Sequence, residues 1–216
     1  MKILCLSNSF KEGGRCIAGI RIDDQNRVYK RYGSQNRPVW VRPVCDTIHE
    51  QIPNHLVSNF GYNDVIEFTP DPSYSRQDYQ SENKMISNNN IRFIKKIKYK
   101  GIINSLCDNN VFPNIFSNTI NSVSETEIGN LNYSLMFASI TNFVVTSVQQ
   151  QYRIQHRLRF HYNANRYNLP ITDPAFITDY ERNSTVLHGI SKIYIVLSLG
   201  VKFNRNYYKL VTTILY

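Results

Sequence analysis

Hydrophobic and polar residues alternate with a period of two over several stretches of the chain, which is typical of β-strands. Residues 152–162 show the pattern most clearly. One face of the predicted strand carries Tyr152, Ile154, His156, Leu158, Phe160 and Tyr162. The opposite face carries Arg153, Gln155, Arg157, Arg159 and His161. A helix would scatter both sets, so we predict a strand with Phe160 in the core and an arginine row on its outer face.

Other segments have the length and composition of strands. Short β-branched or aromatic runs occupy residues 28–32, 40–44 and 65–68. Residues 91–100 alternate as a strand with a basic outer face. The nearly continuous apolar character of residues 193–199 and 207–215 fits central strands of a small closed barrel.

The few helices expected are short. Asp46 has the side chain for an N-cap, but Pro53 must break any helix over residues 46–59. A helix capped by Asp173 is predicted for residues 175–182, with proline in its first turn. Residues 87–90 read as a loop.

The opening segment combines hairpin and ligand-binding features. Apolar runs at residues 3–6 and 16–20 flank a polar loop in which Gly13 and Gly14 permit a tight return. The loop's backbone N–H groups, together with Asn8, Lys11 and Arg15, would suit a phosphate or a nucleotide edge. The alternative is a hairpin turn whose polar residues face water.

Five short motifs are spread over almost the whole chain. They are ILCLSNSFKEGGRCIAGI from residue 3, WVRP at 40–43, YQSEN at 79–83, YNLPITDP at 167–174 and LSLGVKFNRNYYKL at 197–210. Together they resemble the dual OB domain family of bacterial proteins. The resemblance implies two tandem oligonucleotide-binding-type (OB) barrels, usually encoded beside phage-defence components. We expect a mainly β protein with barrels at residues 1–100 and 129–216, packed together, and a connector at 101–128.

Composition narrows the class of partner. The 216 residues carry a formal charge of +9 with a pI near 9.4, which suits a polyanionic partner. The competing explanation is a low-GC genome, which also enriches Asn, Ile, Lys and Tyr. The sequence has no apolar run long enough for a membrane helix and no signal-peptide core, so we expect a cytoplasmic protein without a membrane partner.

The cysteines and histidines show no metal-site spacing. We therefore expect no metal and no cofactor. Cys5, Cys16, Cys45 and Cys107 are expected to be free thiols in a reducing compartment. Cys5 and Cys16 are placed as possible cross-strand neighbours in the first hairpin.

Catalytic signatures are missing from the sequence. There is no nucleophile elbow, P-loop or HExxH motif. The acidic pairs Asp23-Asp24 and Glu125/Glu127 are typical of solvated surface. We therefore predict that the protein is not an enzyme.

Binding chemistry is easier to find. Arg153, Arg157 and Arg159 have the spacing to follow a phosphate backbone, although an ordinary solvent-facing strand would look the same. The amides of the YQSEN motif suit a base edge, or else a network that ties the loop to the barrel. The candidate ligand-binding residues are Asn8, Lys11, Gly13, Gly14, Arg15, Arg42, Gln80, Asn83, Arg153, Arg157 and Arg159.

Two functions fit these observations. The first is a non-enzymatic module of a bacterial defence system that binds single-stranded nucleic acid or a nucleotide through basic strand faces and the glycine-rich loop. The second is a protein-interaction adaptor that docks a co-encoded effector. The basic strand face favours the first, because an adaptor has no need of it.

Overall fold

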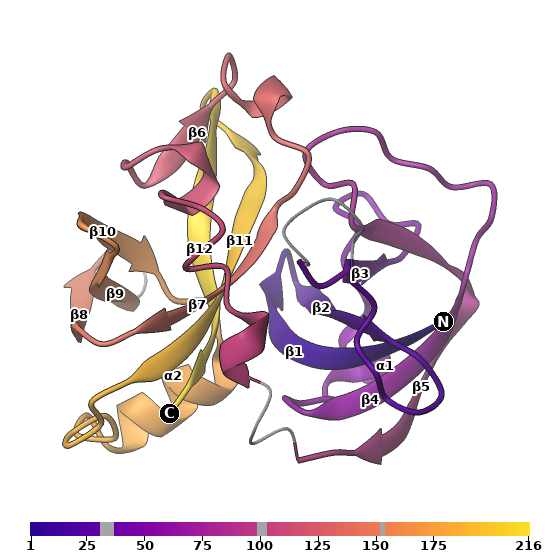
Figure 1. Ribbon diagram of the computed structural model, residues 1–216, viewed down its shortest axis with the longest axis horizontal. Coiled ribbons are helices and arrows are strands. Elements are labelled where there is room, and N and C mark those ends of the chain that lie inside the picture. Colours follow the sequence, from indigo (N-terminus) through magenta and orange to yellow (C-terminus); the bar gives the residue numbers. More distant parts are fainter. Residues whose placement is uncertain (31–36, 99–102, 152–153) are drawn as a thin grey trace. The chain divides into compact units, whose positions relative to one another are not determined.

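The computed structural model describes residues 1–30, 37–98, 103–151 and 154–216 (Figure 1). The chain divides into two compact units, Met1–Leu106 and Cys107–Tyr216. Both units are mainly β, as the sequence predicts.

The first unit is a closed five-stranded barrel. Its elements are β1 (Lys2–Lys11), β2 (Gly14–Ile22), β3 (Trp40–Val44), the one-turn helix α1 (Asn54–Val57), β4 (Asp64–Pro70) and β5 (Asn83–Lys96). The strands follow the order β1-β2-β3-β5-β4, and β4 pairs back onto β1. Strands β3 and β5 are parallel, and every other pair in the barrel is antiparallel.

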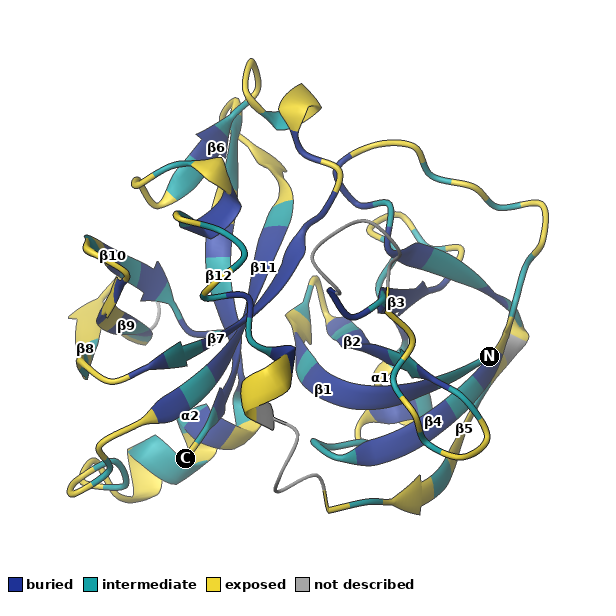
Figure 2. Ribbon diagram, viewed as in Figure 1, coloured by how far each residue is buried: buried dark blue, intermediate teal, exposed yellow. Residues whose placement is uncertain are grey.

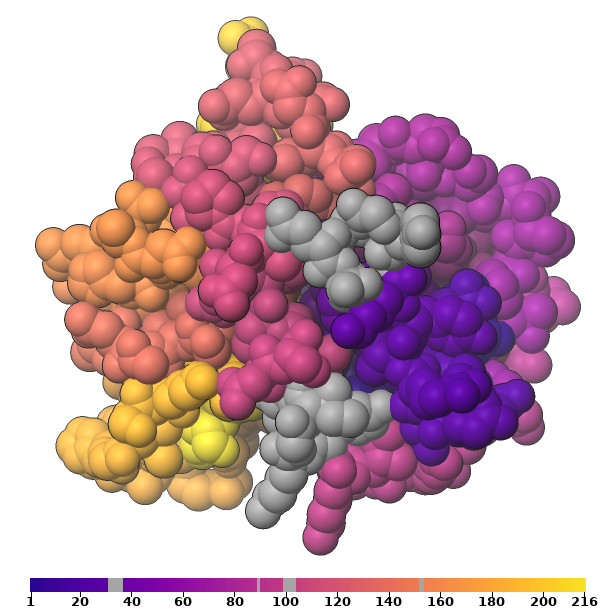
Figure 3. Space-filling view, viewed as in Figure 1, coloured from indigo at the N-terminus to yellow at the C-terminus, as the bar shows by residue number. Residues whose placement is uncertain are grey.

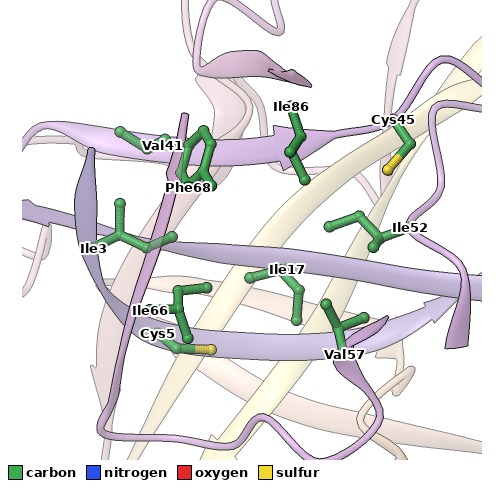
Figure 4. Packing of buried hydrophobic residues seen from close by; sticks show 10 residues of the cluster. All are labelled: Ile3, Cys5, Ile17, Val41, Cys45, Ile52, Val57, Ile66, Phe68 and Ile86. Atoms are coloured by element: carbon green, nitrogen blue, oxygen red, sulfur yellow. The ribbon is translucent and has the colours of Figure 1, made fainter. Parts of the chain in front are cut away.

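Inward-facing aliphatic side chains fill this barrel. Ile3, Ile17, Ile66 and Phe68 are at most 1% exposed and pack with residues from β3, β5 and α1 (Figure 4). Gly19 is required where β2 crosses β1, because a Cβ there would lie 2.2 Å from the carbonyl oxygen of Leu4. The core therefore brings together residues from all five strands.

The opening hairpin differs from the prediction. Residues 7–11 continue β1 and pair with β2, so the polar segment is strand and only Glu12 and Gly13 form the turn. Both turn residues have positive φ, 42° and 77°, as a two-residue hairpin turn requires. The cysteine pairing is also wrong: Cys5 lies opposite Gly19, and Cys16 lies opposite Ser9.

Three other local predictions fail. Residues 46–49 form turns instead of a helix, and α1 begins only after Pro53. Residues 87–90 lie inside β5 at a register shift, with Asn88 at φ 56°, so they form a bulge and not a loop. Val28 and Lys30 make isolated bridges instead of a strand, and residues 31–32 lie outside the described part.

The second unit contains two sheets and one longer helix. Strands β6 (Ser122–Ser124), β12 (Asn206–Leu215), β11 (Ile193–Phe203) and β7 (Leu135–Ile140) form one sheet in that order. The other contains β10 (Asn165–Pro170), β9 (Ile154–Tyr162) and β8 (Phe143–Gln149). Short 3₁₀ turns occur at Ile103–Leu106 in the first unit, and at Ile115–Ser117 and Ile128–Asn130 in the second.

The path of the second unit repeats that of the first. Strands β7 and β8 are separated only by residues 141–142 and together serve as its first strand, pairing with β11 and β9 respectively. Strand β10 meets β12 through one parallel bridge, Ile171 to Val211. With β9, β10, β11 and β12 as the other four strands, the order matches that of the first barrel.

Helix α2 (Pro174–Arg182) lies between the third and fourth strands of this path, as α1 does in the first unit. The carboxylate of Asp173 accepts hydrogen bonds from the backbone N–H groups of Ala175 and Phe176 and also from that of Ile214. The predicted cap is confirmed, and it additionally ties the helix to β12.

Candidate nucleic-acid interface

The outer face of the three-stranded sheet carries the predicted arginine row. Along β9, Leu158, Phe160 and Tyr162 are buried, whereas Arg159 and His161 are exposed and Arg157 is half-buried (Figure 2). The predicted alternation is therefore confirmed from His156 to Tyr162, whereas Ile154, which was expected on the core face, is 55% exposed. Arg153 lies outside the described residues.

Neighbouring strands extend this face. Arg159 lies opposite Val144 on β8 and Asn168 on β10, while His161 lies opposite Arg166. These side chains border a pocket of about 640 Å³. The lining residues are Thr119, Ile120, Asn121, Asn142, Phe143, Val144, Arg159, Phe160, His161, Arg166, Tyr167 and Asn168. We call this the sheet pocket.

The charged side chains that line the sheet pocket are basic. None of its lining residues is acidic. Within the described part of the chain, the guanidinium groups of Arg159 and Arg166 make no hydrogen bond or ion pair. Two unpaired cations beside a pocket with amide and aromatic neighbours form a suitable environment for a phosphate and an adjoining base.

Arg157 contributes differently. Its guanidinium donates to Gln155 Oε1 (2.6 Å), to Asn168 Oδ1 (3.1 Å) and to the carbonyl of Asn168. Burial, and secondly the charge of Arg159, lowers the pKa of Arg157. Arg157 therefore joins β9 to β10 and leaves Arg159 as the available cation of the pair.

One wall of the pocket comes from a segment distant in sequence. Residues 119–121 precede β6, and Asn121 Oδ1 accepts a hydrogen bond from the backbone N–H of Asn168 (3.2 Å). The space-filling view shows the surface of the segment before β6 beside that of β10 (Figure 3). The wall is thus attached directly to the strand that carries Arg166.

In the first unit, most predicted ligand-binding residues of the hairpin make internal contacts. Asn8 donates from Nδ2 to the carbonyls of Val57 and Phe60 and so holds the end of α1. Arg15 lies over the Phe10 ring and donates to Asn54 Oδ1. The backbone N–H groups of residues 7–11 belong to a strand in the barrel sheet, so they do not form the predicted loop clamp.

The two glycines and Lys11 lie at the same end of the hairpin. Gly13 supplies the second positive φ of the turn, and a Cβ on buried Gly14 would lie 2.7 Å from the carbonyl oxygen of Ile52. Lys11 is half-buried, and burial lowers its pKa, with the charges of Arg42 and Arg76 acting in the same direction. A ligand-binding role for Lys11 stays a prediction.

The YQSEN motif forms a buried polar network. Arg42, Gln80 and Asn83 are each at most 3% exposed. Arg42 Nη1 donates to Asn83 Oδ1 (2.9 Å), and Asn83 Nδ2 donates to Glu50 Oε2 (2.9 Å) and Gln80 Oε1 (3.4 Å). Arg76 and Tyr74 bind the same Glu50 carboxylate. The contacts favour the second of the two alternatives, a network that joins the loop to the barrel.

The predicted residues therefore divide into two groups. Arg159 lines the sheet pocket and Arg157 lies beside it on the same face of β9, whereas Arg42, Gln80 and Asn83 lie together inside a network. The sequence analysis missed Arg166 and Asn121. Arg166 has a signal in the sequence, because a turn at residues 163–164 places it opposite His161, but nothing local points to Asn121.

Among the described residues, no three His, Cys, Asp or Glu side chains gather into a possible metal site. None of the four cysteines forms a disulfide, and burial raises the pKa of Cys5 and Cys107 to about 12, so these thiols are poorly nucleophilic at neutral pH. No helix in the described part of the chain has the length and apolarity to span a membrane.

The strand order, the two barrel-like units and the position of each helix define the class of protein as tandem OB folds. The chain belongs to the family described as Dual OB-containing domain, whose model matches residues 1–214. No curated protein matches the sequence.

Several solved structures align with nearly the whole chain. One, described as "Molecular basis for abrogation of activation of pro-inflammatory cytokines", is 10% identical, with a TM-score of 0.33 and 99% of this chain and 90% of that chain covered. Another, "Structural mimicry for functional antagonism", is 13% identical, with a TM-score of 0.33 and coverage of 97% and 87%.

A third is a Replication Protein A heterotrimer bound to ssDNA. It is 9% identical, with a TM-score of 0.30, and the alignment covers 99% of this chain and 48% of that one. At these TM-scores the three likenesses carry no argument about function.

Proposed function

We propose that this protein is a non-enzymatic module that binds single-stranded nucleic acid or a nucleotide through the sheet pocket. The observation that carries the proposal is the pair of unpaired guanidinium groups, Arg159 and Arg166, beside a pocket without an acidic lining residue. The strands involved, β9 and β10, are the second and third strands of an OB path, and that face binds oligonucleotides in OB folds generally.

The chemistry of the pocket suits an unpaired strand better than a duplex. Guanidinium groups neutralise phosphates, whereas the half-buried Phe143 ring and the exposed Asn142 amide would meet a base. Bases in a duplex are already stacked and paired, so they would leave such groups unused.

The test is a binding titration. We would titrate a fluorescein-labelled oligothymidylate of about 16 nucleotides, matched RNA and a duplex by anisotropy at several salt concentrations. The slope of log K against log salt is expected to fall in magnitude by about 0.7 for each phosphate that the variant no longer neutralises. Arg159→Ala with Arg166→Ala should therefore reduce it by about 1.4, because two cations are removed.

Arg182→Ala is the matched control, because Arg182 is an exposed arginine on α2 that is paired only with Asp179 among the described residues. It removes a charge without touching the sheet pocket, so the slope should be unchanged. Equal loss of affinity in control and double variant would show general attraction by net charge instead of a site. Recovery of intact oligonucleotide after incubation tests the non-enzymatic part of the proposal.

The alternative is an adaptor for a co-encoded effector. It has one observation of its own, since Val144 and Val148 on β8 are 53% and 43% exposed on the same outer face. No binding of DNA, RNA or duplex at low salt would discard the nucleic-acid function and favour the adaptor. A place in a bacterial defence system and a cytoplasmic location belong to the proposal for both functions, and neighbouring genes are the observation that tests the former.

A further inference from the structure

A lysine side chain lies completely buried behind the wall of the sheet pocket. Lys209 on β12 is 0% exposed. Its ammonium group donates to the carbonyl oxygens of Ile115 (2.6 Å) and Asn118 (2.9 Å) and to Asn118 Oδ1 (2.7 Å). It also lies 5.3 Å from the centre of the Tyr167 ring. Three oxygen acceptors match the three donors of an ammonium group.

The turn that supplies these oxygens is strained. Phe116 and Ser117 have φ of 46° and 70°, a left-handed conformation that is costly for a bulky side chain. Phe116 is nevertheless fully buried. The turn is therefore held by the packing of the Phe116 ring and by the Lys209 ammonium group. A conformation of this kind persists only where its surroundings fix it, and the ammonium group is the charged part of those surroundings.

The residues that surround the ammonium group are also bonded to the pocket wall, residues 119–121. Asn118 Oδ1 accepts a hydrogen bond from the backbone N–H of Ile120, and the backbone N–H of Lys209 donates to the carbonyl of Asn121 (3.0 Å). The Tyr167 hydroxyl, on a residue that lines the pocket, donates to the Asn118 carbonyl and accepts from the Ile115 N–H. Lys209 therefore contacts the turn before the wall through its ammonium group and contacts Asn121, at the end of the wall, through its backbone N–H.

We infer that Lys209 is a positioning residue for the sheet pocket: its ammonium group fixes the turn at residues 115–118 and so places residues 119–121 beside Arg159 and Arg166. This inference rests on the proposed function for its effect on ligand binding. Its effect on the turn itself is independent of any ligand.

The titration of the ammonium group supports this role and supplies a signature for it. Burial lowers the pKa of Lys209 to about 7, while the Glu127 carboxylate acts in the opposite direction. Tyr167 is the other titratable group at the ammonium, and burial raises its pKa. The paired residue on β11, Leu199, is apolar. Raising the pH above neutrality therefore removes the charge that the turn's oxygens surround.

The first experiment measures the turn directly. Hydrogen exchange is compared for the wild type, Lys209→Met and Lys209→Arg. In Lys209→Met we expect faster exchange at residues 115–121 with unchanged protection along β9. Unchanged exchange at residues 115–121 would overturn the inference whether or not the protein binds any ligand.

The second experiment measures binding of the labelled oligothymidylate at a series of pH values. We expect Lys209→Met to raise Kd about tenfold at pH 6, equivalent to about 1.4 kcal/mol. The wild-type affinity should fall as the pH rises through about 7. Lys209→Met should lose this fall in affinity with rising pH. Superimposable profiles would overturn the inference, whereas failure of the wild type to bind would count against the proposed function alone.

A rescue experiment covers the case in which Lys209→Met does not fold. Lys209→Ala lacks three carbons and the ammonium group, which n-propylammonium restores. Recovery of protection at residues 115–121 with n-propylammonium, but not with tetramethylammonium, supports the inference because only the former has N–H donors. Equal recovery with both ions, or with neither, overturns it.

Discussion

The two units follow one strand order but close in different ways. In the first, every pair of neighbouring strands in the barrel shares a register of at least two residue pairs, including the parallel pair β3 and β5. In the second, the corresponding parallel pair, β10 and β12, meets through the single bridge Ile171–Val211, and the first strand is interrupted between β7 and β8. The second unit therefore has less backbone pairing at these two places, and we expect side-chain packing to matter more there.

The two units also differ in the burial of their polar residues. Arg42 and Asn83 of the first unit are buried and bonded to one another, so the barrel uses them internally. Arg159 and Arg166 of the second unit remain exposed on the outer sheet face. Similar residue types are therefore used internally in one barrel and lie on the surface of the other, where we propose that they bind the ligand. The difference lies in their neighbours, and each of the following changes tests it.

The largest effect, when taken over the whole interval from about pH 7 to 10.5, is expected from the buried charge of the second unit. The pKa of Lys209 is lowered to about 7 in the folded protein and is 10.5 ordinarily, so the unfolded chain binds more protons between these values. The free energy of unfolding should therefore rise with pH across that window, at about 1.4 kcal/mol per pH unit. Urea titrations from pH 7 to about 8, below the ordinary thiol pKa of about 8.5, should show a rise of roughly 1 kcal/mol in the wild type and none in Lys209→Met. Parallel pH curves would contradict it.

The next largest change in the free energy of unfolding is expected from the loss of an aromatic ring in the core. Phe160 is 3% exposed and stacks with Tyr167 at 5.7 Å. Phe160→Ala should lower the free energy of unfolding by about 3–5 kcal/mol, measured by chemical denaturation. Val144→Ala on the exposed side of the same sheet should change it by less than about 0.5 kcal/mol. A small loss for Phe160→Ala would mean that side chains are not what holds the second unit.

The first unit should be sensitive at Gly19, where β1 and β2 lie close together. Gly19→Ala places a Cβ 2.2 Å from the Leu4 carbonyl oxygen, so β1 and β2 must move apart. We expect a loss of about 3 kcal/mol, the upper end for overpacking, from thermal or urea unfolding. Gly129→Ala is the control, because nothing lies within 4 Å of its Cβ position. Equal stability of the two variants would show that the first barrel is more deformable than its pairing suggests.

The smallest change concerns the network of the first unit. Asn83→Ala leaves Arg42 and Glu50 without one partner each, and should cost about 1–2 kcal/mol in unfolding free energy. The exposed Gln77→Ala, in the same connection, should cost almost nothing. The structural interpretation would fail if Asn83→Ala kept full stability but weakened oligonucleotide binding, since Asn83 would then be a ligand contact.

Much of the fold was predictable because its strongest signals are local. The alternation along β9 and the Asp173 cap depend on residues that are neighbours in sequence. Residues 7–11 were misassigned because polar residues usually mark loops, whereas here they continue a strand beyond the core. The bulge at residues 87–90 was taken for a loop for the same reason, since asparagine tolerates the positive φ that bulges and loops share.

The candidate site was predictable only in part. Arg157 and Arg159 follow from the period of their own strand. Asn121 is bonded to Asn168 on β10, and Lys209 is bonded to Asn121. These contacts join segments far apart in sequence, so no local pattern predicts them. A lysine within an apolar strand interrupts the hydrophobic pattern. Its burial is explained only by the carbonyl oxygens that surround its ammonium group.

The parallel pairing of β3 with β5 has a consequence for synthesis on the ribosome. The first barrel is incomplete until β5, which ends at Lys96, has been made. At about 5–20 residues per second, the nascent chain exposes unpaired strand edges for roughly 5–20 seconds. During that interval β1 and β2 can already form their hairpin, but β3 and β4 each lack a neighbour. The chain is therefore most exposed to aggregation before its first hundred residues have been translated.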